Sequence, residues 1–368
     1  MIRRHARLLK IGSLPIGGGA PISVQTMATA DPHDVAALSA QVMCCAEAGA
    51  DIVRLAIPDA AAAETFATVR STSPIPLVAD VHFDHRLALA SIAAGCDALR
   101  INPGNIGGRA NVQAVARAAL ERRVPIRIGV NGGSLEKDIL EKHGSATAEA
   151  LVESAMRHVK LLEDEGFRDI VISVKASDVL RTLAAYRMLA ELTEYPLHLG
   201  VTEAGTVLPG TVRSSVALGI LLDEGIGDTI RVSLTDAPER VVQVGLEILR
   251  ALGLRACGPS VTSCPMCGRT QVDVAHVAAE VETALERYAR TVGSGVRMPH
   301  VAIMGCAVNG PGEAREADIA LCGGKDEFVL YVRGKVAGNV SAENAVDAVV
   351  GQVKSWMASG GNGEENVR

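Results

Sequence analysis

The 368-residue chain is poor in aromatic residues, which make up 2% of it and include a single tryptophan. Its 48% hydrophobic share must therefore come mainly from Ala, Val, Ile and Leu. A core of small aliphatic side chains favours regular layers of helices and strands. The chain is long enough for one large domain and a smaller second one.

Other absences exclude whole classes of protein. No run of about 18 uncharged apolar residues is present, so no transmembrane helix is expected. The basic residues 1–10 are not followed by the apolar segment of a signal peptide, so we expect a cytoplasmic protein. The net charge of −6 and the lack of basic-aromatic clusters argue against nucleic acid as a partner. The sequence also lacks the fingerprint of a nucleotide-binding site. If the protein catalyses a redox reaction, its electrons must therefore come from another protein.

Short runs of β-branched residues recur between residues 22 and 233, separated by alanine-rich stretches. This alternation is typical of parallel βα units. Eight such units close a barrel, so we predict an α/β fold with a (β/α)8 TIM barrel over residues 1–255. The eight predicted strands are 22–24, 52–57, 77–81, 98–101, 126–130, 170–174, 197–201 and 229–232.

Polar and mostly basic residues stand at the carboxyl ends of these strands, where barrel enzymes place their chemistry. Residues two apart in a strand share a face, so Asp80 points with His82, while Val81 faces the helices. Several cations on one inward face predict a ligand rich in phosphate oxygens, a diphosphate or bisphosphate. The inward set is Arg54, Asp80, His82, Arg100, Asn102, Arg127, Asn131, Lys175, Thr202, Glu203, Arg231 and Ser233.

A C-x-x-C pair, Cys264 and Cys267, follows the last βα unit, and Cys306 opens a glycine-rich run that ends at Glu313. Three thiolates and a carboxylate could hold an iron-sulfur cluster with one exchangeable corner. Two alternatives stay open, because C-x-x-C pairs also bind zinc or form redox disulfides. A zinc site would need a fourth ligand, for which His300 is the candidate.

The barrel pattern stops after residue 255. We expect a small α+β iron-sulfur domain over residues 260–358, with helices near 272–292 and 342–357 and strands at 301–304, 318–321, 328–332 and 335–336. Residues 359–368 are expected to form a disordered tail. Cys322 is a further thiol in this domain, but Glu313 shares the glycine loop of Cys306 and is the preferred fourth ligand.

Long motifs link both halves of the chain to one family. They are Val-Ala-Asp80-Val-His82-Phe, Leu-Arg100-Ile-Asn102-Pro-Gly-Asn, Ile-Arg127-Ile-Gly-Val-Asn131, Val-Lys175-Ala-Ser, Gly-Val-Thr202-Glu203-Ala-Gly, Arg231-Val-Ser233-Leu, Cys264-Pro-Met-Cys267-Gly-Arg and Gly-Cys306-Ala-Val-Asn-Gly-Pro-Gly-Glu313. Through them the chain closely resembles the 4-hydroxy-3-methylbut-2-enyl diphosphate synthases of the methylerythritol phosphate pathway, in their bacterial two-domain type. The resemblance covers nearly all of residues 10–357.

This resemblance implies an iron-sulfur oxidoreductase that opens 2-C-methyl-D-erythritol 2,4-cyclodiphosphate, with two electrons and loss of water. It implies a 4Fe-4S cluster on Cys264, Cys267, Cys306 and Glu313, with Glu313 also taking part in catalysis. Glu203 is the expected acid for the departing hydroxyl, with Asp80 second. The rest of the inward set is expected to bind the substrate.

The same resemblance implies reduced ferredoxin or flavodoxin as electron donor, and a head-to-tail homodimer in which the cluster domain of one chain covers the barrel of the other. Two rivals remain. One is a zinc-containing barrel lyase or pterin-type synthase acting on another phosphate ester, since such barrels share a basic mouth. The other is an iron-sulfur sensor that binds a phosphorylated metabolite.

Overall fold

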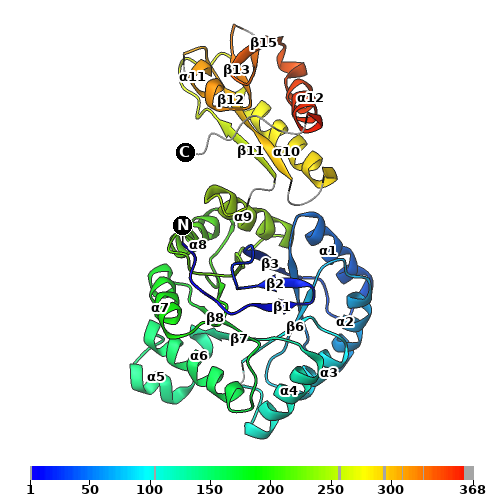
Figure 1. The fold of residues 1–368 in the computed structure, drawn as a ribbon, viewed down its shortest axis with the longest axis vertical. Helices are drawn as coiled ribbons and strands as arrows, with labels where there is room; N and C mark the ends of the chain where they lie inside the picture. The colour runs from blue at the N-terminus through cyan, green and yellow to red at the C-terminus, as the bar shows by residue number, and fades with distance from the viewer. Residues whose placement is uncertain are drawn as a thin grey trace. The chain divides into compact units, whose positions relative to one another are not determined.

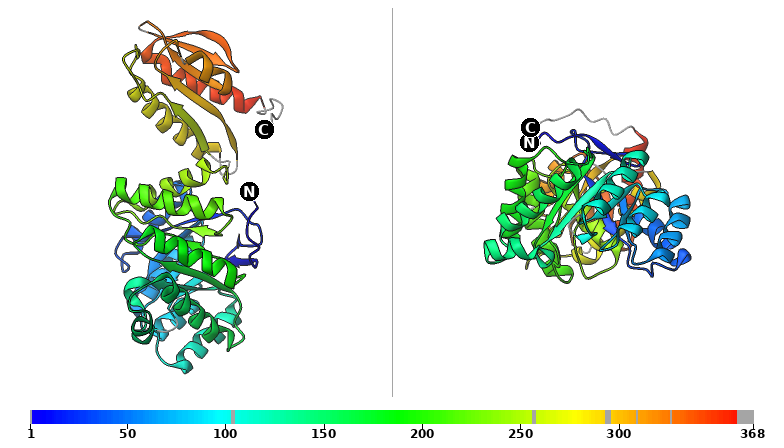
Figure 2. Two further views of the ribbon diagram at one scale, coloured as in Figure 1. Left: turned by 90° about the vertical axis from the view of Figure 1, so that its left-hand side faces the viewer. Right: turned by 90° about the horizontal axis from the view of Figure 1, so that it is seen from below.

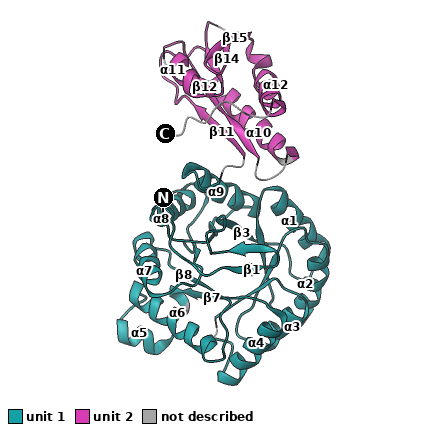
Figure 3. Cartoon of the chain, in the orientation of Figure 1, with its two compact units in different colours: residues 1–255 teal, residues 256–368 magenta. Residues whose placement is uncertain are grey.

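The computed structural model (Figure 1) describes residues 2–102, 105–255, 258–292, 296–308, 310–325 and 327–359. The chain divides into two compact units, Met1–Arg255 and Ala256–Arg368 (Figure 3). None of the helices in the described ranges combines the length and the apolar character needed to cross a bilayer. Of the expected tail over residues 359–368, residues 360–368 lie outside the described residues.

A parallel barrel forms the first unit, as predicted. Its strands in the described ranges are β3 (Ser23–Met27), β4 (Ile52–Ala56), β5 (Leu77–Asp80), β6 (Ala98–Ile101), β7 (Ile126–Asn131), β8 (Ile170–Lys175), β9 (His198–Leu199) and β10 (Thr229–Ile230). They pair in the order β8-β7-β6-β5-β4-β3-β10-β9, and a parallel bridge between Ile172 and Leu197 joins the two ends. β9 and β10 are shorter than predicted. A backbone hydrogen bond from Arg231 N to Leu199 O nevertheless continues their pairing.

Helices surround this barrel (Figure 2). Several begin at an Asp or Thr whose side chain accepts a hydrogen bond from the first turn, as Asp34 does from Ala37 N and Asp178 from Arg181 N. The helices are α1 (Val35–Glu47), α2 (Ala60–Thr72), α3 (His85–Ala93), α4 (Arg109–Arg122), α5 (Lys137–His143), α6 (Ala148–Glu163), α7 (Val179–Leu192), α8 (Val207–Asp223) and α9 (Pro238–Ala251).

Two apolar cores lie on opposite sides of the barrel strands. Outside, the residues predicted to face the helices do so, and Val81, Ile101 and Val232 are buried in that core. Inside, the hairpin of β1 (Leu9–Ile11) and β2 (Leu14–Ile16) packs its apolar residues against Ile52 and Val78. These two residues lie at the amino ends of their strands, so the hairpin seals that end. The polar side chains are left to the carboxyl end.

The second unit is a five-stranded sheet in the order β11-β12-β13-β14-β15. The strands are β11 (Gly258–Ser263), β12 (Arg297–Met304), β13 (Ile319–Gly323), β14 (Phe328–Val332) and β15 (Lys335–Val340). β11, β12 and β13 pair in parallel, whereas β14 is antiparallel to both of its neighbours, β13 and β15. Such a mixed sheet is expected for an α+β unit. β11 escaped prediction because an edge strand with a polar sequence shows no hydrophobic alternation.

Two long helices, α10 (Val274–Val292) and α12 (Ala345–Ala358), pack on this sheet, near their predicted positions. Their apolar residues form one core with those of the strands, including Val281, Ile303 and Val349. A short helix, α11 (Gly310–Glu316), belongs to a separate cluster through Ala314, with Cys322 of β13. The glycine-rich run after Cys306 had suggested a loop, but its second half is this helix.

Candidate functional site

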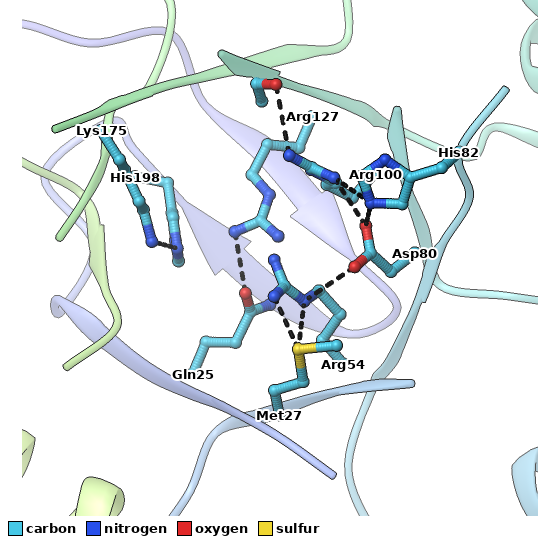
Figure 4. Close-up of polar contacts among 10 residues, drawn as sticks. Gln25, Met27, Arg54, Asp80, His82, Arg100, Arg127, Lys175 and His198 are labelled. Atoms are coloured by element: carbon cyan, nitrogen blue, oxygen red, sulfur yellow. Dashed lines mark hydrogen bonds and ion pairs between the residues drawn. The ribbon is translucent and has the colours of Figure 1, made fainter. Parts of the chain in front are cut away.

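Five cationic side chains meet inside the barrel, and Figure 4 shows four of them, Arg54, Arg100, Arg127 and Lys175. They extend inward from β4, β6, β7 and β8 and from the residue after β10: Arg54, Arg100, Arg127, Lys175 and Arg231. Only about a twentieth of Arg100, Arg127 and Lys175 is exposed, at 5%, 6% and 6%. The predicted convergence of these cations is therefore what the structure shows.

Asp80 is the carboxylate at the centre of this cluster. Its Oδ1 lies 3.0 Å from Arg100 Nη1, and its Oδ2 lies 3.5 Å from Arg54 Nε. Burial alone would raise the pKa of Asp80, but the positive charges of Arg54 and Arg100 lower it below the usual range. Asp80 is thus an ionised partner that orients two arginines, and it has no proton to give near neutral pH.

His82 lies at the more open side of the cluster, with 46% of its side chain exposed. Its Nε2 is 2.6 Å from Arg100 Nη1. A guanidinium can only donate, so Nε2 accepts this hydrogen bond and the ring proton belongs on Nδ1. His82 can therefore offer Nδ1–H as a donor to an anionic ligand.

Arg127 is held on one side only. Its Nη1 donates to Gln25 Oε1 at 2.8 Å, while its buried Nε and Nη2 have no hydrogen-bond partner in the described structure. Arg231 Nε and Ser233 Oγ are buried without partners as well. A buried donor without an acceptor costs about 1–3 kcal/mol, so these groups are suited to a ligand that brings acceptor oxygens.

Lys175 contacts a histidine that the sequence analysis missed. Its Nζ lies 3.4 Å from Nε2 of His198, which is only 1% exposed. Burial, followed by the charge of Arg127, lowers the pKa of His198 well below its ordinary value, so the ring is neutral. The signal was present in the sequence, because His198 shares the inward parity of Gly200 and Thr202.

Two glycines give the long cations room. A Cβ at Gly129 would lie 2.7 Å from Arg100 Nη2, and one at Gly200 would lie 2.8 Å from Lys175 Nζ. Atoms so close would push the charged groups away. These glycines therefore let Arg100 and Lys175 lie across the inner wall of the barrel.

The other predicted residues are placed less uniformly. Asn102 is buried beyond the end of β6, and Asn131 is partly buried at the end of β7, opposite Lys175 in the register. Thr202 and Glu203 follow β9, and Glu203 is exposed with a φ of +52°. A non-glycine residue in this left-handed region is uncommon, and such strain clusters at functional loops. In the part of the chain that is described, Glu203 makes no polar contact with the five cations.

The thiols of the second unit gather at one edge of its sheet. Cys264 follows β11, and Cys306 follows the neighbouring parallel strand β12. Cys264 N donates to Ile303 O at 2.9 Å, and Gln271 N donates to Gly305 O at 3.1 Å. The C-x-x-C turn is thus hydrogen-bonded to the segment that carries Cys306.

The candidate ligands differ in exposure. Cys267 and Glu313 are exposed, Cys264 is intermediate, and Cys306 is buried at 8%. Gly310 N, at the start of α11, donates to Cys306 O at 3.2 Å, which ties the helix of Glu313 to the third thiol. In the described ranges no three His, Cys, Asp or Glu side chains converge as ligands of a single ion. A cluster does not require this, because each ligand binds a different iron.

Soft thiolates are suitable ligands for iron-sulfur clusters and for zinc. The three thiols and the carboxylate of Glu313 therefore fit an iron-sulfur group, although thiolates alone would also fit zinc. His300, the alternative zinc ligand, has its Nε2 2.8 Å from Thr262 Oγ1. Cys322 packs under Gly310, where a Cβ would lie 2.8 Å from its Sγ. Burial, with a smaller effect of Cys306, raises the pKa of Cys322 to about 11, so this thiol stays protonated.

Two family models match the chain. The GcpE TIM-barrel domain matches residues 6–246, and the GcpE protein C-terminal domain matches residues 260–355. The chain is 51% identical over 357 residues to the 4-hydroxy-3-methylbut-2-en-1-yl diphosphate synthase (flavodoxin) of Geobacter sulfurreducens, covering 97% of this chain and 99% of that protein. It is 53% identical over 357 residues to the protein of the same name from Symbiobacterium thermophilum, covering 97% and 94%. A dihydropteroate synthase structure from Xanthomonas albilineans aligns with a TM-score of 0.46 and 19% identity over 67% of this chain and 98% of that one.

Proposed function

The chain belongs to the GcpE family, and we propose that it converts 2-C-methyl-D-erythritol 2,4-cyclodiphosphate to 4-hydroxy-3-methylbut-2-enyl diphosphate. It is an iron-sulfur oxidoreductase of isoprenoid biosynthesis. In the reaction one C–O bond to the diphosphate and one to a hydroxyl break, and a C=C bond forms. Two electrons and a proton enter and water leaves, so the linear product carries one more negative charge than the cyclic substrate.

The main support for this proposal is that several buried hydrogen-bond donors in the barrel have no acceptor. Arg127 Nε and Nη2, Arg231 Nε and Ser233 Oγ need acceptors, and a diphosphate supplies several. Donors fixed before binding can stabilise the charge that appears on the diphosphate as the ring opens. His82 Nδ1–H, with Asn102, Asn131 and Thr202, would complete this binding set.

Proton delivery falls to Glu203 rather than Asp80 in this proposal. The two arginines that bind Asp80 keep it ionised, so it serves to position Arg54 and Arg100. Glu203 is exposed in the loop after β9, where it can pick up a proton from solvent. Its left-handed backbone conformation is consistent with a loop shaped for function.

We propose that Cys264, Cys267, Cys306 and Glu313 hold a 4Fe-4S cluster. When bound, such a cluster passes electrons one at a time to a substrate. This chain contributes the C-x-x-C turn, the buried thiol of Cys306 and a carboxylate at the first turn of α11. A carboxylate is a weaker ligand for iron than a thiolate, so Glu313 marks the corner that a substrate oxygen can replace.

Flavodoxin is the proposed electron donor, because the curated relatives carry it in their name. Reduced ferredoxin is the second candidate. The cysteines of the described residues are free thiols, which suits a reducing compartment, and we expect the cytoplasm.

We further propose a homodimer. Leu208, Val212, Val216 and Ile220 recur every four residues along α8 and are 75%, 52%, 47% and 37% exposed. Residues at this spacing share one helix face, and an apolar stripe of this kind is suited to a protein contact. A second copy of the chain would bury the same stripe about a two-fold axis.

We propose for this dimer the head-to-tail form that the family resemblance implies. Within the barrel unit, Arg255 Nη1 and Nη2 lie 2.6 and 2.9 Å from the carboxylate of Asp51, which directly precedes β4. Arg255 is thus held at the amino end of the barrel, opposite the cations.

The decisive experiment is turnover by anaerobically purified protein. With dithionite or reduced flavodoxin, the cyclodiphosphate should yield the linear diphosphate, and the protein should be brown with about four irons and four sulfides per chain. A colourless zinc protein would favour the barrel lyase instead. A brown protein that binds the cyclodiphosphate without converting it would favour the sensor.

A further inference from the structure

The cations inside the barrel outnumber their carboxylate partners. Asp80 forms its ion pairs with Arg54 and Arg100. Among the residues that the structure describes, Arg127, Lys175 and Arg231 make no ion pair with a carboxylate. Burying an unpaired charge is so costly that a titratable group normally loses its charge instead.

Lys175 is the member of this cluster that can lose its charge. An arginine stays protonated in proteins, whereas a buried lysine changes protonation readily. Lys175 extends from β8 into the barrel, and its Nζ has neutral His198 of β9 as a neighbour, at 3.4 Å. Gly200 leaves it room but offers it no polar side chain.

Positive groups face Lys175 from several other strands. They are Arg231 after β10, Arg127 of β7, Arg54 of β4 and Arg100 of β6, and burial followed by these four charges lowers the pKa of Lys175 well below its ordinary value. The remaining titratable groups of the cluster are Asp80 of β5, whose charge is used by the two arginines, and His82, which accepts from Arg100.

We propose that Lys175 is a neutral amine while no anion is bound, and that it becomes an ammonium group when the diphosphate binds. Binding would then take up a proton from solvent. This inference rests on the proposed function, because it assumes that the ligand is a diphosphate. It adds that Lys175 adjusts its charge to the bound state.

The positive charge of the ammonium form of Lys175 would also favour the reaction. The cyclic substrate brings two negative charges into the cluster, which restore the ammonium form of Lys175. The linear product carries a further negative charge, which the same ammonium group would stabilise. A permanent cation in its place would impose the repulsion on the substrate-free protein as well.

The cyclodiphosphate is a clean probe for this proton. Each of its phosphorus atoms carries only one strongly acidic hydroxyl, and it lacks the second ionisation that a phosphate monoester shows at about pH 6. Its charge is therefore constant near neutral pH. Any proton taken up on binding must go to the protein.

Isothermal titration calorimetry of the full-length, cluster-loaded protein measures this uptake. The cyclodiphosphate is titrated anaerobically, without reductant, in HEPES and in Tris at one pH, because the two buffers differ in ionisation enthalpy. We expect uptake of about one proton per chain for the wild type. Lys175→Arg carries a permanent charge and should bind with almost no uptake, while the surface variant Lys160→Arg should behave like the wild type.

Zero uptake by the wild type overturns the proposal, and chloride-dependent affinity would then show that a small anion balances the charge. Unchanged uptake in Lys175→Arg overturns it too, by assigning the proton to another group. If that variant does not fold, His82→Gln decides: retained uptake supports Lys175, and lost uptake points to His82. Failure of the wild type both to bind and to convert the cyclodiphosphate would instead reject the proposed function.

Discussion

Arg100 lies across the bare backbone of Gly129, so that a Cβ atom on this glycine would come within 2.7 Å of Arg100 Nη2. Gly129→Ala should therefore displace Arg100 from Asp80 and from the diphosphate. A misplacement of about 1 Å can cost up to about 100-fold in rate, so we expect kcat/KM to fall by about 10- to 100-fold. Iron content should not change.

The matched control for this variant is Gly133→Ala, because an added Cβ there meets no atom within 4 Å. Steady-state kinetics and iron analysis on the same samples check the prediction. Wild-type kinetics in Gly129→Ala would mean that the position of Arg100 does not matter for turnover.

Arg127 should lower the stability of the substrate-free protein and strengthen the binding of the substrate. Arg127→Met removes one of several clustered positive charges at constant bulk, so the unfolding temperature of the substrate-free protein should rise. Substrate affinity should fall by about 1.5–3 kcal/mol, the value of a hydrogen bond to a charged group. Calorimetry gives both numbers, and Arg122→Met, on the exposed end of α4, serves as control. A variant with lower stability and unchanged affinity would contradict the assignment of Arg127.

Cys267→Ser should lose the iron-sulfur cluster and all activity, because serine is a poor ligand for iron in place of a thiolate. The barrel should still fold, since Cys267 is exposed on the separate second unit. Visible absorption, iron analysis and circular dichroism on one anaerobic sample test this. Cys44→Ser, an exposed cysteine of α1, should keep the colour. Full iron content in Cys267→Ser would remove this residue from the ligand set.

Glu136 should give the barrel a pH-dependent part of its stability. Burial would raise its pKa, but the hydrogen bonds from His158 and Ser154 lower it from 4.5 to about 2. A lowered carboxyl pKa stabilises the fold above pH 4.5, and this contribution is lost as the pH falls toward 2. Glu136→Gln should cost about 1 kcal/mol at pH 7 and progressively less below pH 4.5.

Urea unfolding of the barrel at pH 7, 5 and 4 measures this effect. Glu141→Gln, on the exposed side of α5, should show a smaller loss at every pH. A loss in Glu136→Gln that does not shrink on acidification would mean that the ionised carboxylate is not what stabilises this segment.

The apolar stripe on α8 should determine the oligomeric state. Leu208→Lys with Val212→Lys places two charges on the exposed stripe, so the double variant should be monomeric in sedimentation experiments. Leu120→Lys, on an exposed site of α4 away from the stripe, should leave the dimer intact. A wild-type protein that is monomeric at high concentration would rule out the dimer itself.

Local patterns predicted much of the fold. Alternation correctly assigned Val81, Ile101 and Val232 to the helix side and the cations to the interior, because strand parity is a property of adjacent residues. Prediction failed where the signal depends on partners. The polar edge strand β11 pairs only because β12 lies beside it.

The site shows the same division. Residue types alone suggested a polyanion, yet His198 went unnoticed because an isolated histidine in a strand is usually structural. Asp80 was the second candidate acid, and the charges of its two arginine partners lower its pKa, which disfavours that role. Glu203, the alternative acid, remains a prediction.

By itself the sequence determined the number of βα units, the face on which each cation lies and the set of thiols available to a metal cluster. These features follow from spacing along the chain. Only the tertiary structure decided which charges share a partner: Asp80 serves Arg54 and Arg100, while Arg127 is left with Gln25. The reason is physical, because ion pairing depends on distances between strands that are far apart in sequence, and burial then fixes which of these groups keeps its charge.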